Sequence, residues 1–288
     1  MRILILGGDG MLGHQLLRHF ASRHETRVTV RQPLGAYSGF GLFSADNAYP
    51  GIELSSTKGL KPVLAGFKPE AVINAVGIVK QRPTADEVIP SLEINALLPH
   101  RLAILCREIG TRLVHISTDC VFSGRKGSYR EADPSDAEDL YGRTKYLGEV
   151  HESNCLTLRT SMIGPELFRK TGLLEWFLAR RGTIQGYRNA IFSGFTTIEL
   201  ARVIEMLLTR FPQASGLYHV SSAPISKFDL LTLIKERLAL DVEITPYDDF
   251  RCDRSLNSSR FQAEFGYRPP DWPAMVDELA IQLQGVPT

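Results

Sequence analysis

A tyrosine and a lysine four residues apart, Tyr141 and Lys145, are the residues of this chain whose types and spacing could do chemistry. On a helix, residues at i and i+4 share one face, so the phenol and the ammonium would lie side by side. An ammonium favours the phenolate and lowers the pKa of a tyrosine from about 10 towards neutral pH. Such a tyrosine can act as a general acid or base. A surface helix with a packed tyrosine and a solvated lysine is the ordinary alternative.

A third candidate comes from the segment ISTDCVFSG, residues 116–124, which begins as a buried strand and turns to small polar residues. Parallel strands present functional residues at their carboxyl ends, where Thr118 and Asp119 are expected. A hydroxyl there could hold a substrate carbonyl. Thr118, Tyr141 and Lys145 together are what hydride transfer from a reduced cofactor to a ketone requires.

The start of the chain predicts where such a cofactor would bind. A short apolar run, residues 3–6, precedes the sequence GGDGMLG, and an amphipathic helix pattern follows it. The glycines fit G-x-x-G-x-x-G counted from Gly7 and G-x-G-x-x-G counted from Gly8. Strand, glycine turn and helix form the dinucleotide fingerprint, in which the glycines admit a pyrophosphate to the helix N-terminus. A tight turn that binds nothing is the alternative.

The residue after the second predicted strand, 27–30, indicates which dinucleotide would bind. An NAD site usually has Asp or Glu there, to bind the ribose 2′-hydroxyl, whereas this chain has Arg31. An arginine accommodates a 2′-phosphate. We therefore expect NADP(H), with NAD(H) less favoured and a solvated surface charge as the remaining interpretation of Arg31.

Further strands are predicted at 71–74, 111–118 and 155–160, and further helices at 57–67, 91–109 and 226–239. This pattern predicts an α/β fold with a parallel sheet. Residues 32–56 are expected to be loop, with a short strand near 52–54. Ala75 and Gly77 end the strand at 71–74, and small residues there leave room for a ligand. Asn95, amid an apolar helix pattern, is expected to be a structural hydrogen bonder.

The bulk composition limits the classes of function. The chain has 288 residues, 43% apolar and 23% charged, with a net charge of +1 and no basic stripe for nucleic acid. Its four cysteines lack C-x-x-C spacing and are expected to be reduced thiols rather than disulfide or zinc ligands. The N-terminal apolar run is too short for a signal peptide, and no run approaches the length of a membrane helix. We expect a cytoplasmic protein that binds neither nucleic acid nor membrane.

Motifs along nearly the whole chain resemble the extended short-chain dehydrogenases/reductases and, within them, the dTDP-4-dehydrorhamnose reductase family. They are GGDGMLG, VINAVG, EINALLPHRLA, HISTDCVFSG, YGRTKYLGE, LRTSMIGPE and DRSLNSSRFQAEFGYRPPDW. The resemblance implies a Rossmann-like doubly wound parallel sheet with a smaller C-terminal substrate-binding lobe. Residues 1–161 would bind NADP(H), residues 190–220 would return to that domain, and residues 162–288 would mainly form the lobe. It also implies NADPH-dependent reduction of the 4-keto group of a nucleotide-linked 4-keto-6-deoxy sugar, for cell-surface polysaccharide precursors.

The resemblance also implies roles for single residues. Thr118 would polarise the carbonyl, Tyr141 would donate the proton, and Lys145 would lower the pKa of the tyrosine and hold the nicotinamide ribose. The cofactor-binding candidates are Gly7, Gly10, Met11, Leu12, Gly13, Arg31, Ala75, Val76, Gly77, Tyr141 and Lys145. The substrate-binding candidates are Thr118, Asp119, Cys120, Met162, Phe195, Arg251 and Arg254. Core packing is the alternative for Phe195, and a surface position is the alternative for either arginine.

The chain departs from the family pattern at two positions beside the sugar. Cys120 stands where the family usually has tyrosine, and Met162 stands where it usually has tryptophan. The loss of two aromatic side chains should change which hexose fits while leaving the hydride chemistry intact. A UDP-linked acetamido sugar is therefore as good a candidate as dTDP-4-dehydrorhamnose.

Two other functions remain open. A nucleotide-sugar 4-epimerase or 4,6-dehydratase would retain NAD tightly, which Arg31 disfavours. A dehydratase would also need an acid pair, and Asp119 is followed by Cys120 rather than glutamate. A non-catalytic regulatory subunit of the same fold is the second alternative, and the intact Thr118, Tyr141 and Lys145 disfavour it. The superfamily is often dimeric, so a homodimer is an expected partner, and no residue pattern predicts a metal site.

Overall fold

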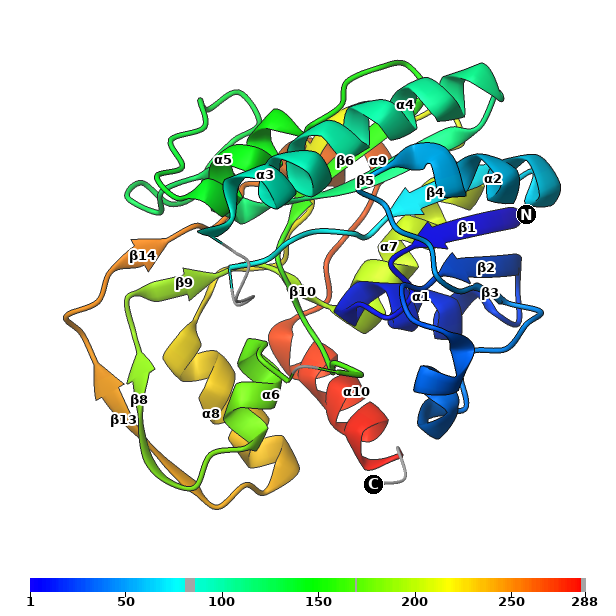
Figure 1. Ribbon diagram of the computed structural model, residues 1–288. Coiled ribbons are helices and arrows are strands. Elements are labelled where there is room, and N and C mark those ends of the chain that lie inside the picture. The colour runs from blue at the N-terminus through cyan, green and yellow to red at the C-terminus, as the bar shows by residue number, and fades with distance from the viewer. Residues whose placement is uncertain (81–85, 169, 286–288) are drawn as a thin grey trace. The chain divides into compact units, whose positions relative to one another are not determined.

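The buried apolar runs of the sequence form a seven-stranded sheet in the order β3-β2-β1-β4-β5-β6-β11 (Figure 1). Its strands are β1 (Arg2–Leu6), β2 (Glu25–Thr29), β3 (Ala48–Tyr49), β4 (Ala71–Asn74), β5 (Arg112–Thr118), β6 (Cys155–Thr160) and β11 (Gly216–His219). The pairs β1–β2, β1–β4, β2–β3 and β4–β5 are parallel. The strand order reverses between β1 and β4, so the carboxyl ends of these two strands form the switch point at which such sheets bind ligands. This sheet confirms the predicted Rossmann-like α/β class.

Helices cover both faces of the sheet, which explains why β4 is buried along its whole length. They are α1 (Met11–Phe20), α2 (Leu60–Phe67), α3 (Val88–Ser91), α4 (Leu98–Glu108), α5 (Leu140–Leu147) and α7 (Thr197–Arg210). Figure 1 shows α4 and α5 on one face and α1 and α7 on the other. At the second face, Glu205 of α7 joins His19 and Arg23 of α1, at 2.8 and 2.7 Å.

Two predicted segments differ from the observed ones. The short strand expected near 52–54 lies instead at β3, and the expected loop contains a 3-10 helix, η1 (Leu34–Phe40). The helix predicted over 91–109 begins at Val88 and contains a π-helical segment, η4 (Leu92–Leu97), between α3 and α4. Proline is tolerated in a first helical turn, so Pro90 does not stop the helix from starting there.

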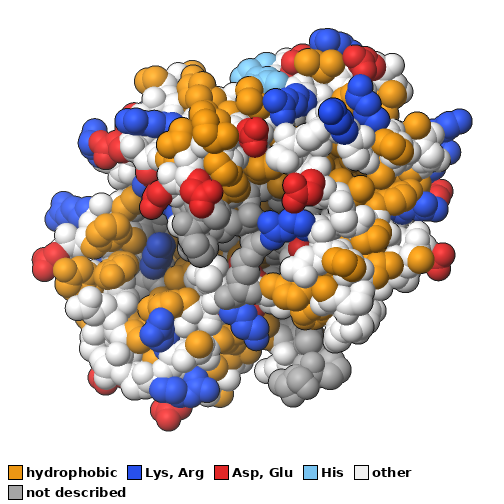
Figure 2. Space-filling model, in the orientation of Figure 1, with side chains coloured by type: hydrophobic (Ala, Val, Ile, Leu, Met, Phe, Trp, Pro, Cys, Tyr) orange, Lys and Arg blue, Asp and Glu red, His pale blue; other side chains and the backbone are white. Residues whose placement is uncertain are grey.

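The helical stretch Val88–Glu108 is long and apolar enough to cross a membrane by length and composition alone. Because 44% of its apolar window is buried inside the protein, it resembles a helix that packs on the core, and it is weak evidence for a membrane. Some of its apolar side chains are nevertheless exposed. Figure 2 shows hydrophobic side chains gathered over α3 and α5, where Val88, Ile89, Tyr146 and Leu147 are 45–66% exposed.

The structure describes residues 1–80, 86–168 and 170–285, which divide into two compact units. The first unit comprises Met1–Ser117, Glu138–Leu158 and Ala201–Leu217, and the second comprises Thr118–Ala137, Arg159–Leu200 and Tyr218–Thr288. The second unit contains η5 (Asp119–Val121), β7 (Met162–Ile163), α6 (Leu173–Leu178), β8 (Gly182–Tyr187), β9 (Ala190–Phe192), β10 (Phe195–Thr196), β12 (Ile225–Ser226), α8 (Lys227–Leu238), β13 (Val242–Tyr247), β14 (Cys252–Asp253), α9 (Ser259–Phe265) and α10 (Trp272–Gln284). Its strands pair as β7–β10, β8–β13 and β12–β9–β14.

Candidate active site

Tyr141 and Lys145 lie one helical turn apart on α5, whose start is fixed by an acidic cap. Asp139 is the N-cap residue, and its Oδ1 accepts a hydrogen bond from the backbone N–H of Gly142 at 2.8 Å. Aspartate is a favoured N-cap because it satisfies an otherwise unpaired donor of the first turn. The cap therefore sets where α5 begins and, with it, where Tyr141 lies.

The ammonium of Lys145 is buried against the sheet. Its residue is 3% exposed, and Nζ donates to the carbonyl oxygen of Ile116 in β5 at 2.6 Å. Burial lowers the pKa of Lys145 to about 8, and the carboxylate of Glu149 opposes this shift. Glu149 is itself buried and accepts a hydrogen bond from Ser117 Oγ at 2.7 Å. Ile116 precedes Thr118 by two residues along the same strand.

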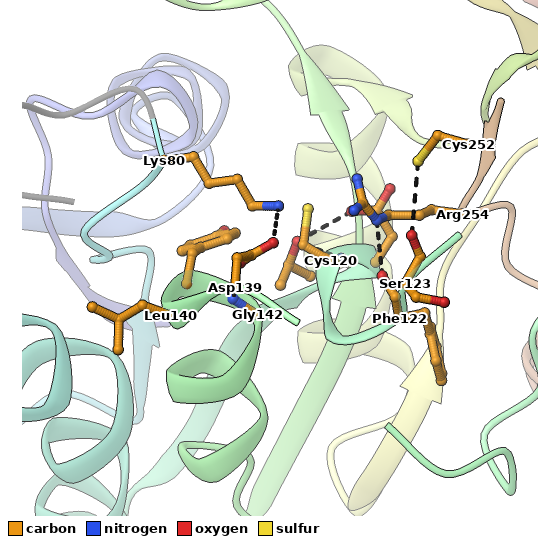
Figure 3. Close-up of polar contacts among 12 residues, drawn as sticks. Lys80, Cys120, Phe122, Ser123, Asp139, Leu140, Gly142, Cys252 and Arg254 are labelled. Atoms are coloured by element: carbon orange, nitrogen blue, oxygen red, sulfur yellow. Dashed lines mark hydrogen bonds and ion pairs between the residues drawn. The ribbon is translucent and has the colours of Figure 1, made fainter. Parts of the chain in front are cut away.

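A second lysine lies beside Tyr141, and the sequence analysis missed it. Lys80 Nζ lies 2.5 Å from Asp139 Oδ2 (Figure 3). The same atom lies 5.9 Å from the centre of the Tyr141 ring. The Lys80 side chain is 33% exposed, and that of Asp139 is 41% exposed. The only signal in the sequence was an aspartate three residues before Gly142 at the start of the helix, because Lys80 lies 59 residues away along the chain.

Asn95 ties the segment after β4 to α5. Its Oδ1 accepts from the backbone N–H of Ile78, and its Nδ2 donates to the carbonyl oxygen of Ile78, both at 2.9 Å. Nδ2 also donates to Thr144 Oγ1 at 3.2 Å. The side chain is 1% exposed and lies in the π-helical segment. These bonds confirm that Asn95 is a structural hydrogen bonder. Its partner on α5, Thr144, directly precedes Lys145 in the sequence.

The glycine turn has the shape that a dinucleotide cradle requires. Gly7 adopts a φ of +82°, a left-handed conformation that favours glycine, and its carbonyl accepts from the N–H of Gly10 at 3.0 Å. A Cβ on Gly13 would lie 2.0 Å from Gly7 O, so no larger residue fits there. Gly10 caps α1 without a side chain. The first N–H groups of α1, from Met11 to Gly13, have no partners within the helix, and such groups suit a phosphate.

The second segment predicted to bind the cofactor, residues 75–77, lies against this turn. Ala75, Val76 and Gly77 follow β4 and are half-buried. The Cγ2 atom of Val76 would be 2.9 Å from a Cβ on Gly7, so the two segments are in close contact. Asn74 holds this segment by accepting from the N–H of Val76 at 3.2 Å. The structure therefore brings together the candidates from the ends of β1 and β4.

Arg31 is exposed and lies close to the glycine turn. The hydroxyl of Tyr37 accepts from the N–H of Gln32 at 3.0 Å and donates to Asp9 Oδ2 at 3.1 Å. Burial raises the pKa of Tyr37, and the charge of Arg31 lowers it, so the guanidinium lies within electrostatic reach of the phenol. Tyr37 also contacts Asp9 inside the turn, so Arg31 lies within electrostatic reach of a side chain that is bonded to the glycine turn.

Three of the substrate candidates lie at the start of η5, in the second unit. Thr118 is the last residue of β5 and caps η5, because its Oγ1 accepts from the N–H of Cys120 at 3.1 Å. The same hydroxyl donates to Asp119 Oδ1 at 3.2 Å. Thr118 and Asp119 are 7% and 8% exposed, whereas Cys120 is half-buried. A substrate carbonyl would have to take the place of Asp119 as the acceptor of the Thr118 hydroxyl.

The remaining substrate candidates in the second unit have different surroundings. Met162 is half-buried in β7, and Arg251 is exposed. Arg254 donates from Nε to the carbonyl oxygen of Phe122 at 2.8 Å (Figure 3). Phe195 is fully buried and packs edge-to-face on Tyr267, at 6.1 Å between ring centres. Its ring presents no surface to a ligand, which favours core packing over substrate contact.

The second unit also contains a cavity of about 430 Å³ that no sequence motif indicated. Its lining includes Trp176 of α6, Tyr187 of β8 and Lys227 of α8. Arg180 lies over the Trp176 ring, with 4.6 Å between its Cζ and the ring centre. The walls thus combine aromatic surface with two cationic side chains, a combination that suits a ligand with a flat ring and a negative charge.

The protein has no cluster of three or more His, Cys, Asp or Glu residues suited to a metal ion within the part of the chain that the structure describes. None of the four cysteines is joined in a disulfide, and all four lie within the described residues. Burial raises the pKa of both Cys106 and Cys155 to about 12, so neither supplies a thiolate near neutral pH.

Comparisons with known proteins agree with this architecture. A family model described as the RmlD substrate binding domain matches residues 1–284. The dTDP-4-dehydrorhamnose reductase of Escherichia coli strain K12 is 29% identical, and the match covers 98% of each chain. The spore coat polysaccharide biosynthesis protein SpsK of Bacillus subtilis strain 168 is 26% identical, with 94% of each chain covered.

A solved structure shows the same fold. It is the dTDP-4-dehydrorhamnose reductase of Bacillus anthracis strain Ames in complex with NADP, with a TM-score of 0.78 and 22% identity. The match covers 98% of this chain and 99% of that chain. With the family model spanning almost the full length, the chain belongs to the RmlD substrate binding domain family, which confirms the predicted resemblance to dTDP-4-dehydrorhamnose reductases.

Proposed function

We propose that this protein is an NADPH-dependent reductase of the 4-keto group of a nucleotide-linked 4-keto-6-deoxy sugar. Its relatives include a dTDP-4-dehydrorhamnose reductase and a protein of spore coat polysaccharide biosynthesis, so the product would be a precursor of a cell-surface polysaccharide. We further propose that the first unit binds the cofactor and the second binds the sugar nucleotide.

One observation carries the proposal. Lys145 lies one turn from Tyr141, and its ammonium is buried and bonded to the strand that leads to Thr118. Burying a charged lysine is costly, and a purely structural position would be filled more favourably by an apolar side chain. A buried ammonium one helical turn from a phenol, in a fold with a glycine cradle, supports a role in proton transfer.

In the proposed reaction, bound NADPH supplies a hydride to the carbonyl carbon. Thr118 holds the carbonyl oxygen through its hydroxyl, and Tyr141 donates a proton to the alkoxide that forms. Lys145 stabilises the resulting phenolate through its positive charge. The N–H groups at the start of α1 would hold the pyrophosphate, and Arg31 would hold the 2′-phosphate. The close approach of Gly13 to Gly7 brings the start of α1 against the glycine turn, as this binding mode needs.

The sugar nucleotide would use residues of the second unit. The cavity walled by Trp176 and Tyr187 fits a nucleobase, and Arg180 and Lys227 fit the adjoining diphosphate. Cys120 and Met162 are smaller or more flexible than the aromatic residues usual in the family, so the hexose site would have more room. A UDP-linked acetamido sugar is therefore a candidate substrate beside dTDP-4-dehydrorhamnose.

The test is NADPH consumption on a panel of dTDP- and UDP-linked 4-keto sugars. Tyr141→Phe removes only the phenolic hydroxyl, and we expect it to lower kcat by roughly 10²- to 10⁴-fold. Tyr146→Phe, on an exposed part of the same helix, is the matched control and should keep full activity. Unchanged turnover in Tyr141→Phe would remove Tyr141 from the reaction.

The ultraviolet spectrum of the purified protein tests the cofactor mode. A reductase exchanges NADPH at each turnover and should lose it on extensive dialysis. Tightly retained NAD(H) would instead indicate the epimerase or dehydratase chemistry and would contradict the proposal. Binding of NADPH without turnover of any sugar would indicate a regulatory subunit.

We also propose that the protein is a cytoplasmic homodimer. The exposed apolar side chains of α3 and α5 form a surface that a second copy would cover. Ile89→Glu should yield a monomer by sedimentation analysis, whereas Ile281→Glu, another exposed isoleucine outside this surface, should leave the dimer intact. A monomeric wild type would refute the dimer.

A further inference from the structure

We propose that the ion pair of Lys80 and Asp139 is a positioning element for the proton donor: it fixes the start of α5 and places an ammonium against the ring of Tyr141. The contacts lie within the first unit, and the role in catalysis rests on the proposed function. Neither residue was among the site residues predicted from the sequence.

Hydrogen bonds at Ile78 and an ion pair at its own side chain hold Lys80 in position. Two residues earlier, Ile78 is held at its N–H and its carbonyl by Asn95, which also bonds to Thr144 on α5. Lys80 itself meets Asp139, whose other oxygen caps the same helix. The segment after β4 is therefore bonded to α5 at two places, at Thr144 through Asn95 and at the N-cap Asp139 through Lys80. These two attachments hold the Lys80 ammonium near the Tyr141 ring.

A cation within about 6 Å of an aromatic ring face is attracted by it, and a nearby positive charge also favours the ionised phenol. Lys80 meets this distance, at 5.9 Å from the ring centre. Lys145 alone cannot supply a constant charge over the alkaline range, because burial lowers its pKa to about 8. Lys80, paired with Asp139, adds a second cation beside the Tyr141 ring.

Other charged residues lie on α5 and on the elements near it. Of the elements packed on α5, η4 carries Glu93, and α3 carries no charged residue. In β5, His115 is fully buried, and burial and the charge of Lys145 hold its pKa well below the ordinary value, so it is neutral. On α5 itself, Arg143 lies two residues from Tyr141 and Lys145 lies four.

Opposite charges at one site give the proposal a distinctive signature. Lys80→Met removes the cation and leaves Asp139 negative, so Tyr141 should stay protonated to a higher pH. Asp139→Asn removes the anion and keeps an N-cap, since asparagine caps helices as well as aspartate does. It leaves Lys80 unbalanced and should shift the ionisation of Tyr141 to a lower pH. The double variant removes both charges and should return close to the wild type.

The ionisation of Tyr141 is measurable without substrate. An ultraviolet difference titration against Tyr141→Phe in each background isolates the tyrosinate signal of this one residue. We expect a shift of about half a pH unit upward for Lys80→Met and a similar shift downward for Asp139→Asn, given partial solvent screening at this distance. Lys80→Arg, which keeps the charge, is the control and should show no shift. Lys80→Gln repeats the neutral change if the methionine variant folds poorly.

In the pH profile of kcat, activity falls at alkaline pH when the proton donor ionises. The pH of this fall should rise in Lys80→Met and drop in Asp139→Asn. A pair that only braces the helix would lower activity or stability in both single variants without opposite shifts. Shifts of the same sign, or none, would overturn the proposal. If no variant and no wild-type sample reduces any sugar, the proposed function fails, whereas the titration still decides the role of the ion pair.

Discussion

The buried ammonium of Lys145 makes the stability of the protein depend on pH in a way that one substitution can isolate. In the unfolded chain the pKa of lysine is about 10.4, whereas burial in the folded protein lowers it to about 8. Below pH 8 both states bear the charge, and burying it opposes folding. As pH rises from about 8 to about 10.5 the folded protein loses the proton first, so this opposition is progressively relieved and stability rises.

The size of the effect follows from the pKa difference. A difference of about 2.5 units corresponds to roughly 3 kcal/mol at neutral pH, and little discount for solvent is needed because Lys145 is 3% exposed. Lys145→Met removes this cost. It also leaves the carbonyl of Ile116 without its donor, which costs about 1–3 kcal/mol. The net change in the free energy of unfolding at pH 7 is therefore small. The change of this difference with pH is what tests the lowered pKa of Lys145.

The assay is urea unfolding of wild type and Lys145→Met at pH 7 and pH 10. The free energy of unfolding of the wild type, relative to the variant, should rise by about 2.5 kcal/mol between the two conditions. Groups that do not interact with Lys145 titrate equally in both proteins and cancel, and carrying Tyr141→Phe in both backgrounds removes the phenol that does interact with it. A difference that stays constant with pH would refute a strongly lowered pKa. The same variant should lose nearly all reductase activity, so stability and turnover would respond separately.

Three further substitutions test other parts of the site. Gly13→Ala places a methyl group 2.0 Å from Gly7 O, so it should lower the free energy of unfolding by roughly 1–3 kcal/mol and weaken NADPH binding; normal binding by fluorescence titration would contradict the cradle. Arg31→Asp should shift the ratio of kcat/KM for NADPH and NADH by about tenfold or more towards NADH, and an unchanged ratio would make Arg31 a surface charge. Trp176→Ala should raise KM for the sugar nucleotide and leave KM for NADPH unchanged; a change in the NADPH value alone would refute the proposed role of the cavity.

The sheet was predictable because its strands are continuous apolar runs bounded by glycine or polar residues. The strands expected at 71–74 and 155–160 match β4 and β6 residue for residue. The loop expected over 32–56 was less well predicted, because η1 depends on contacts that no local pattern contains. Tyr37 holds it through Asp9, 28 residues earlier.

In the site, too, residues joined by a local sequence pattern could be predicted, and residues joined only by the fold could not. Tyr141 and Lys145 could be found because their spacing on one helix is itself the signal. Lys80 could not, because its partner Asp139 lies 59 residues away and only the fold joins them. The cavity in the second unit was also missed, since its walls come from α6, β8 and α8, and no motif spans these elements.

The glycine turn has a consequence for the thermodynamics of ligand binding. Its backbone is already held by bonds from Gly7 N to Thr29 Oγ1 at 3.2 Å and from Gly8 N to Thr29 O at 2.8 Å. A loop that is ordered in advance loses little conformational entropy when a ligand arrives. Dinucleotide affinity should therefore track the contacts made, and calorimetry should find no ordering penalty from this turn. Thr29 would then influence affinity by holding the glycine turn in its binding conformation.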